Sequence, residues 1–75
     1  MIVNLYDVKR NQTGKYIYCK DNNKGKELVA YGFFVGVEID VVSRTKQGVV
    51  VRVLDGLFSL NKYLAEKIMV EVEKL

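Results

Sequence analysis

The longest apolar run in the chain, LVAYGFFVGVEIDVV at residues 28–42, carries Gly32 and Gly36 at GxxxG spacing. A membrane-spanning helix needs about 20 consecutive apolar residues with few charges. Glu38 and Asp40 interrupt this run, and its uncharged part is only about half of that length. GxxxG indicates helix pairing only within a membrane span. We therefore interpret the run as several short elements and not as one helix.

The two glycines divide the run into a helix end and a strand. KELVAY, residues 26–31, contains good helix formers, and Gly32 follows it directly, where a residue with positive φ commonly ends a helix. Gly36 fits a tight turn. The alternating sequence VEIDVVSR, residues 37–44, then predicts a half-buried antiparallel strand with Val37, Ile39 and Val41 facing inward and Glu38 and Asp40 facing outward.

Short strands are also predicted on both sides of this run. KYIYCK is rich in aromatic and β-branched residues, and we expect Tyr16 and Tyr18 on one face with Ile17 and Cys19 on the other. Asp55-Gly56 predicts a two-residue type I′ turn between the strands VVVRVL and LFSL. The other predicted elements are turns at Asn11 and Gly14, a loop at residues 21–25, a helical turn in NKYLAEK with Asn61 as its N-cap, and a last strand in IMVEVE.

These elements predict a mainly β fold with about five strands and two short helical turns. Closing such a sheet into a barrel removes exposed edges and lets one-sided strands share a core. The chain is short for an OB-fold, so we expect a small SH3-like β-barrel. Nothing in the sequence resembles a linker or a repeat, and residues 1–75 are expected to form one domain.

The side-chain inventory argues against an enzyme and against a metal or cofactor site. The chain has no His, and Cys19 has no second Cys to pair with. On a strand, this Cys is expected to be a small buried apolar residue. Two carboxylates two residues apart on one strand, Glu38 and Asp40, with Glu71 or Glu73 nearby, offer too few converging oxygens for a hard cation. No phosphate-binding glycine motif is present.

The net charge of +3 and the pI of about 9.1 leave a nucleic-acid-binding barrel as an alternative. Its stacking residues would be Tyr16, Tyr18 and Tyr63. Basic and acidic residues are mixed along the chain, however, and such a surface is more often simply solvated. Nucleic acid is therefore not the expected partner.

Four bulky residues flank the first glycine: Tyr31 before Gly32, and Phe33, Phe34 and Val35 after it. A small barrel cannot easily turn all four inward. They either close one end of the barrel or form an exposed patch that contacts a partner protein. Phe34 and Val35 are the stronger candidates for exposure. Self-association through Phe34, Val50 and Leu54 stays open as a further alternative.

The run also resembles a segment of the FeoA family (ferrous iron transport protein A), which reads Leu-x-x-hydrophobic-Gly-hydrophobic-x-x-Gly-x-x-hydrophobic-x-Val. The matching positions are Leu28, Tyr31, Gly32, Phe33, Gly36, Ile39 and Val41. Similar matches to the family's opening and closing segments lie at Asp7, Val8 and Gly14, and at Leu60, Ala65, Ile68 and Val70. Val35 stands where many members have a proline, and the loop SRTKQG is short for the family.

The resemblance implies a cytoplasmic accessory protein of ferrous iron uptake that regulates or assembles the FeoB transporter through protein contact. It implies no catalysis, and a role at the membrane only through that partner. Similar domains follow the DNA-binding region of iron-dependent repressors, which makes an iron-regulator-type interaction domain the alternative. A start at Met1 favours a stand-alone protein, and no signal peptide is recognisable. Without His, a ferrous-iron site in the chain itself is not expected.

Overall fold

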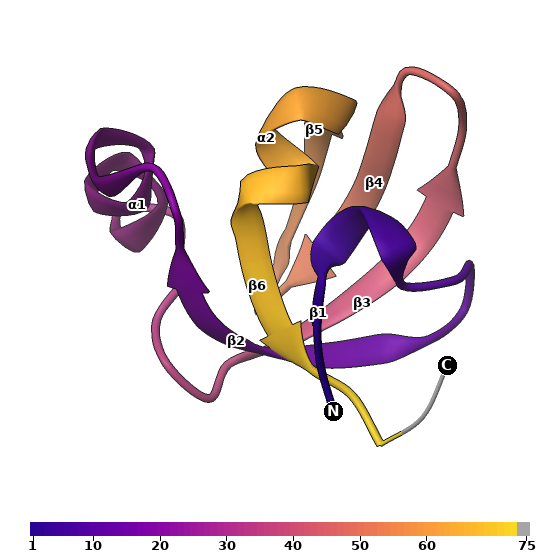
Figure 1. Ribbon diagram of the computed structural model, residues 1–75, viewed down its shortest axis with the longest axis horizontal. Helices are drawn as coiled ribbons and strands as arrows, with labels where there is room; N and C mark the ends of the chain where they lie inside the picture. The colour runs from indigo at the N-terminus through magenta and orange to yellow at the C-terminus, as the bar shows by residue number, and fades with distance from the viewer. Residues whose placement is uncertain (74–75) are drawn as a thin grey trace.

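The computed structural model describes residues 1–73 and contains one antiparallel sheet of six strands, two α-helices and one 3-10 helix (Figure 1). In chain order these are β1 (Ile2–Asn4), the 3-10 helix (Leu5–Asp7), β2 (Thr13–Cys19), α1 (Asn22–Val29), β3 (Glu38–Arg44), β4 (Gly48–Val53), β5 (Gly56–Asn61), α2 (Lys62–Lys67) and β6 (Ile68–Glu71). The mainly β prediction is confirmed. The expected single domain of residues 1–75 includes two residues, 74 and 75, that lie outside the described part.

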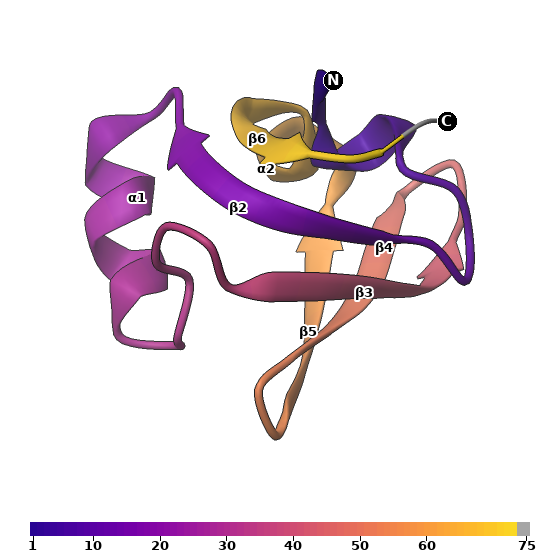
Figure 2. The same ribbon diagram turned by 90° about the horizontal axis from the view of Figure 1, so that it is seen from below.

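The strands follow the order β1-β6-β2-β3-β4-β5, so β1 and β5 form the two edges of the sheet. The sheet curls strongly, and α1 stands beside it, next to the segment that leads into β3 (Figures 1 and 2). Five strands were predicted, and β1 is the additional one. Three residues are too few to show an alternating pattern, and β1 exists because Ile2 and Val3 pair with Glu71 and Val70 of β6.

The predicted inward face of residues 37–44 is confirmed, and two other segments bury one face in the same way. Their aliphatic side chains are at most 8% exposed and form one cluster with the rest of the core. The residues are Val37, Ile39 and Val41 on or just before β3, Val49, Val51 and Val53 on β4, and Ile68, Val70 and Val72 on or just after β6. Alternation at period two places each set on one side of its strand.

The predicted faces of β2 are wrong. Tyr16 is 6% exposed whereas Tyr18 is 49% exposed, and Cys19 is buried as expected. The pairing of β2 with β6 shifts by one residue between Tyr16 and Tyr18. A β-bulge of this kind reverses the alternation after it, which is why two residues predicted for the same face lie on opposite faces.

Helix α1 begins earlier than predicted, inside the segment that was expected to be a loop. The Asp21 carboxylate accepts hydrogen bonds from the backbone N–H groups of Asn23 and Lys24 at 3.0 and 3.1 Å. This N-cap satisfies donors that have no partner within the helix. The asparagines and Gly25 concealed the helix because they disfavour helices on average.

Two turn predictions are confirmed and two are wrong. Asn11 has a φ of +69°, and Asn61 caps α2 by accepting from Leu64 N at 2.8 Å. Gly14 lies within β2, where a Cβ would come within 2.8 Å of the Val70 side chain. The β4–β5 hairpin also differs by one residue. Val53 pairs with Gly56, so the two loop residues are 54 and 55, and the first of them, a leucine, takes a φ of +54°.

Candidate interaction site at the glycine corner

Residues 30–37 form a tight connection between α1 and β3, which we call the glycine corner. Its Gly32 has a φ of +99° and Gly36 a φ of +90°, a region that side chains with a Cβ rarely adopt. Val37 N donates to Phe34 O at 3.0 Å, which makes residues 34–37 a turn with Gly36 at its third position. Gly36 N also donates to Tyr16 O at 2.8 Å, so the corner is tied to the neighbouring strand β2.

The four bulky residues of the corner separate into one buried and three exposed side chains. Phe33 is fully buried, with its ring edge-to-face against Tyr16 and Phe58 at centroid distances of 6.1 and 5.6 Å. Phe33 was predicted as a partner-contact residue, but it is fully buried and is not part of the exposed surface. Phe34 is 51% exposed and Val35 74% exposed, and Tyr31 is similarly open to solvent.

The tip of the β4–β5 hairpin extends this exposed surface. Leu54 lies over Gly32, since a Cβ on that glycine would come within 2.8 Å of Leu54 Cδ1. The Tyr31 ring packs edge-to-face on Phe58 of β5 at 5.5 Å. We define the apolar surface by its exposed members, which are Tyr31, Phe34, Val35, Leu54 and Leu57.

Leu57 was missed by the sequence analysis, and Leu54 was considered only for self-association. The signal that could have found them is the hairpin itself. A turn placed one residue earlier moves Leu54 into the loop and turns Leu57 to the solvent side of β5. The predicted patch therefore supplies three of the five residues of this apolar surface, and the β4–β5 hairpin supplies the other two.

Burial of Tyr16 beneath the corner has an electrostatic consequence. Removal of the ring from water raises the pKa of the Tyr16 hydroxyl above 10.0, and the nearby Cys19 raises it further. A phenol with a raised pKa is a poor base near neutral pH. The corner thus offers apolar contact area and not acid–base chemistry.

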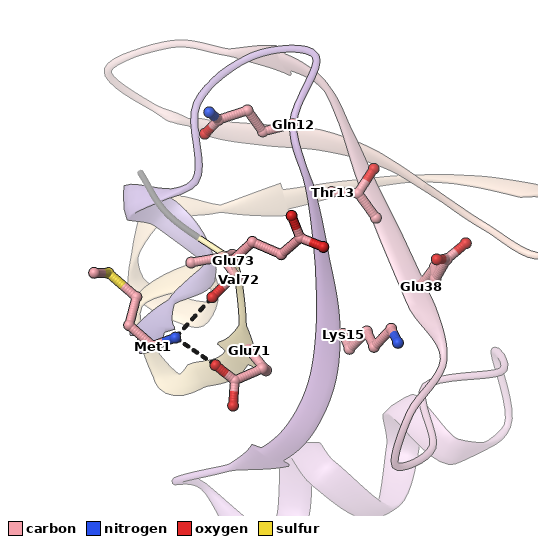
Figure 3. Close-up of a pocket in the computed structure, with 8 residues that line it drawn as sticks. All are labelled: Met1, Gln12, Thr13, Lys15, Glu38, Glu71, Val72 and Glu73. Atoms are coloured by element: carbon pink, nitrogen blue, oxygen red, sulfur yellow. Dashed lines mark hydrogen bonds and ion pairs between the residues drawn. The ribbon is translucent and has the colours of Figure 1, made fainter.

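Three of the carboxylates considered as metal ligands, Glu38, Glu71 and Glu73, line a separate pocket of ≈ 570 Å³ (Figure 3), whereas Asp40 accepts a hydrogen bond from Thr13 Oγ1 at 2.6 Å. Lys15 of β2 stands in register between Glu38 of β3 and Glu71 of β6. The Met1 ammonium donates to Glu71 Oε2 at 2.5 Å and to Val72 O at 2.7 Å. Two cations thus already face these carboxylates. In residues 1–73, no three His, Cys, Asp or Glu side chains are grouped so that they could hold a metal ion.

The three tyrosines proposed for base stacking do not form a platform. Tyr16 is buried, so its ring cannot stack on a base. Tyr18 and Tyr63 are exposed on different elements, β2 and α2, and the Tyr63 ring already carries the Lys67 ammonium at 5.2 Å from its centroid. This geometry gives the nucleic-acid alternative no support.

No helix within the described 73 residues has the length and apolar character needed to cross a bilayer.

A family model described as the FeoA domain matches residues 3–72. The chain belongs to the FeoA family. Its SH3-like fold, as predicted, is shared with solved structures of the same family. One, described as the iron uptake regulatory protein FeoA, superposes with a TM-score of 0.83 at 26% identity and covers 95% of this chain and 96% of its own.

Two further structures share the fold at lower identity. FeoA of Stenotrophomonas maltophilia, described as a prokaryotic SH3 domain protein complexed with zinc, has a TM-score of 0.82 at 18% identity and covers 92% of this chain and 89% of its own. A manganese-dependent transcriptional repressor has a TM-score of 0.83 at 16% identity. That match covers 95% of this chain, which spans only 41% of the repressor. No curated protein matches by sequence.

The donor set of this FeoA-family chain does not fit zinc. Zinc sites in proteins are built mainly from His nitrogen and Cys sulfur. The chain has no His, and its one Cys, Cys19, is buried. The family's role in ferrous iron transport therefore gives no reason to assign a metal site to residues 1–73 of this chain.

Proposed function

We propose that this FeoA-family protein serves ferrous iron transport as a non-catalytic accessory domain, residues 1–75, which binds the cytoplasmic part of the FeoB transporter. The contact surface is the apolar surface of the glycine corner and the β4–β5 hairpin. Family membership supports the link to ferrous iron transport. The exposure of Val35, at 74%, is the observation that carries the choice of surface.

Exposed aromatic and aliphatic side chains cost free energy in water when they lie together, and such clusters commonly mark protein contacts. Here the backbone under them is fixed, because Gly32 and Gly36 hold the corner in shape and Leu54 packs over it. A rigid apolar surface loses little conformational entropy on binding. It is thus suited to a contact that regulates or assembles a partner.

The test is titration calorimetry of this protein with the cytoplasmic part of FeoB from the same genome, at low and high salt. Phe34→Ser and Val35→Ser are compared with Tyr63→Ser, which changes an aromatic residue that is also more than half exposed but lies outside the apolar surface. Central residues of an interface contribute about 2 kcal/mol or more, so each corner variant should bind roughly 30-fold more weakly. Tyr63→Ser should bind like the wild type.

Salt should change the affinity little, because apolar contacts are not screened. Equal weakening by all three variants would remove the corner from the interface. Saturable nucleic-acid binding that falls steeply with salt, without binding to the transporter, would favour the barrel alternative instead.

A further inference from the structure

The strand β5 presents an open row of backbone hydrogen-bonding groups. It is the last strand of the sheet, and among residues 1–73 it pairs only with β4. In a hairpin with a two-residue loop, the residues that flank the loop form a hydrogen-bonded pair, and the pairs then alternate. Val53 and Gly56 are this first pair, so Phe58 and Leu60 also bond to β4. Leu57 and Ser59 must direct their N–H and C=O groups away from the sheet.

The alternation is supported at the far end of the hairpin, where Lys62 N donates to Gln47 O at 2.8 Å, as the same pattern requires. Within residues 1–73, no hydrogen bond reaches the outward backbone groups of Leu57 or Ser59. Both residues are exposed. Free N–H and C=O groups on a strand edge are the template for adding another strand.

The sequence of this strand carries none of the residues that usually protect an exposed edge. Natural proteins shorten their edge strands, or place lysines, prolines or inward-pointing charges on them. The sequence of β5 is GLFSLN, which is six residues long and has no charge and no proline. Such an edge is normally covered in the working state of a protein.

A groove of ≈ 350 Å³ runs along the same edge. Four consecutive residues of β5, 57–60, line it, so it follows the strand and not merely one of its faces. Leu28 of α1 and Tyr31 form the opposite wall, and the buried Phe33 lies at its base. Because α1 stands opposite the strand, the groove suits a single extended chain better than the whole sheet of a second copy.

The charges of the groove define the chemistry of its occupant. Lys24 and Glu27 line it, and they pair with each other at 3.3 Å. The remaining lining residues carry no charge, so the groove has no net charge to match. An uncharged extended segment with an apolar side chain is therefore complementary to it.

We propose that an extended, uncharged segment of the FeoB cytoplasmic part adds to β5 as a further strand. Its backbone bonds to Leu57 and Ser59, and one of its apolar side chains enters the groove between Leu28 and Phe58. This inference rests on the proposed function, because it names how that partner is held. It differs from the contact at Phe34 and Val35 in depending on backbone groups.

The experiment measures amide hydrogen exchange of the full chain by NMR, with and without the cytoplasmic part of FeoB from the same genome. Binding should slow exchange at Leu57 and Ser59 by at least about tenfold, as expected for amides that gain hydrogen bonds. The amides of Phe58 and Leu60, which already bond to β4, should change little and serve as internal references.

The variant Ser59→Pro removes one outward N–H, a change that the edge of a sheet tolerates. It should weaken binding by about tenfold or more, whereas Ser59→Ala, which keeps the N–H, should bind like the wild type. Unchanged protection of Phe58 and Leu60 shows that the variant is folded. If it does not fold, the exchange measurement on the unaltered chain still decides.

Slowed exchange at both outward amides, with loss of affinity in Ser59→Pro alone, supports strand addition. Saturable binding with unchanged exchange at Leu57 and Ser59 overturns strand addition and leaves the proposed function standing. Absence of any binding overturns both.

Discussion

The two edges of the sheet are built in opposite ways. The edge strand β1 has three residues, and its ends are tied to the rest of the chain. Met1 bonds to β6 and the residue after it through its ammonium group, and its C=O accepts from Val72 N at 2.8 Å. At the other end, the Asn4 side chain accepts from Asp7 N at 3.1 Å and begins the 3-10 helix. The edge strand β5 is twice as long and faces a groove.

This difference separates a structural edge from one available for binding. Met1 and Asn4, at the two ends of β1, make hydrogen bonds within the chain, whereas Leu57 and Ser59 of β5 direct their backbone N–H and C=O groups toward solvent. Exposed apolar side chains occur at both edges, with Met1 and Ile2 at β1, but those near β5 include Tyr31 and Leu57, which line the groove, and Leu54 at the hairpin tip. The β1 edge is short and bonded to the chain at both ends, and the β5 edge combines a longer row of free backbone groups with a groove lined by apolar side chains.

The strongest test of this division removes the core beneath the β5 side. Phe33→Ala should lower the free energy of unfolding by about 4 kcal/mol, because a fully buried ring that packs on Tyr16 and Phe58 leaves a cavity. Urea denaturation followed by circular dichroism measures this change. The neighbouring Phe34→Ala is the matched control and should change stability by no more than about 0.5 kcal/mol.

Equal losses in the two variants would mean that Phe34 is also part of the core. Phe34 would then be unavailable to a partner, although its side chain is 51% exposed.

Much of this fold could be predicted from local patterns. The alternating valines of β3 and β4 and the apolar positions of β6 indicate which face of each strand is buried. This alternation can be recognised in each strand without knowing which strands pair with it. Where the strand register depends on a bulge or on the exact position of a turn, it could not be predicted from the sequence. The β-bulge near Tyr16 and the loop at Leu54 are set by pairing with other strands, and no local signal marks them.

The site could be predicted only in part for the same reason. Gly32 and Gly36 indicated the corner, because positive φ values strongly favour glycine. Which of two adjacent phenylalanines points inward depends on how the corner sits on Tyr16 and Phe58. Leu57 joins the surface through the hairpin register, and that register depends on contacts far apart in sequence.

A smaller effect concerns Tyr16, which lies beneath the corner. The pKa of its hydroxyl is raised in the folded state by burial and then by Cys19. A raised pKa in the folded state stabilises the fold below the unfolded value near 10.0, and this stabilisation is lost as the pH rises through the folded pKa. Tyr16→Phe should therefore lose less stability than the wild type above about pH 10.

Thermal unfolding from pH 8 to pH 11 measures this difference. Tyr63→Phe, at an exposed position on α2, should follow the wild-type curve. A Tyr16→Phe curve parallel to that of the wild type would mean that the hydroxyl is solvated and that the core under the corner is wetter than its exposure of 6% indicates.

The smallest effect is expected at the closed edge. Glu71→Gln removes the ion pair with the Met1 ammonium but keeps an oxygen that can accept its hydrogen bond. Both side chains are about half exposed, so the loss should be about 0.5 kcal/mol and should shrink as salt is added. Chemical denaturation at 20 mM and 500 mM salt tests this. Lys24→Gln, which breaks the other exposed pair, beside the β5 groove, is the matched control and should cost a similarly small amount. A loss at Glu71 several times larger than at Lys24, and independent of salt, would mean that the chain terminus does more than close β1, and that both edges depend on a few strong contacts.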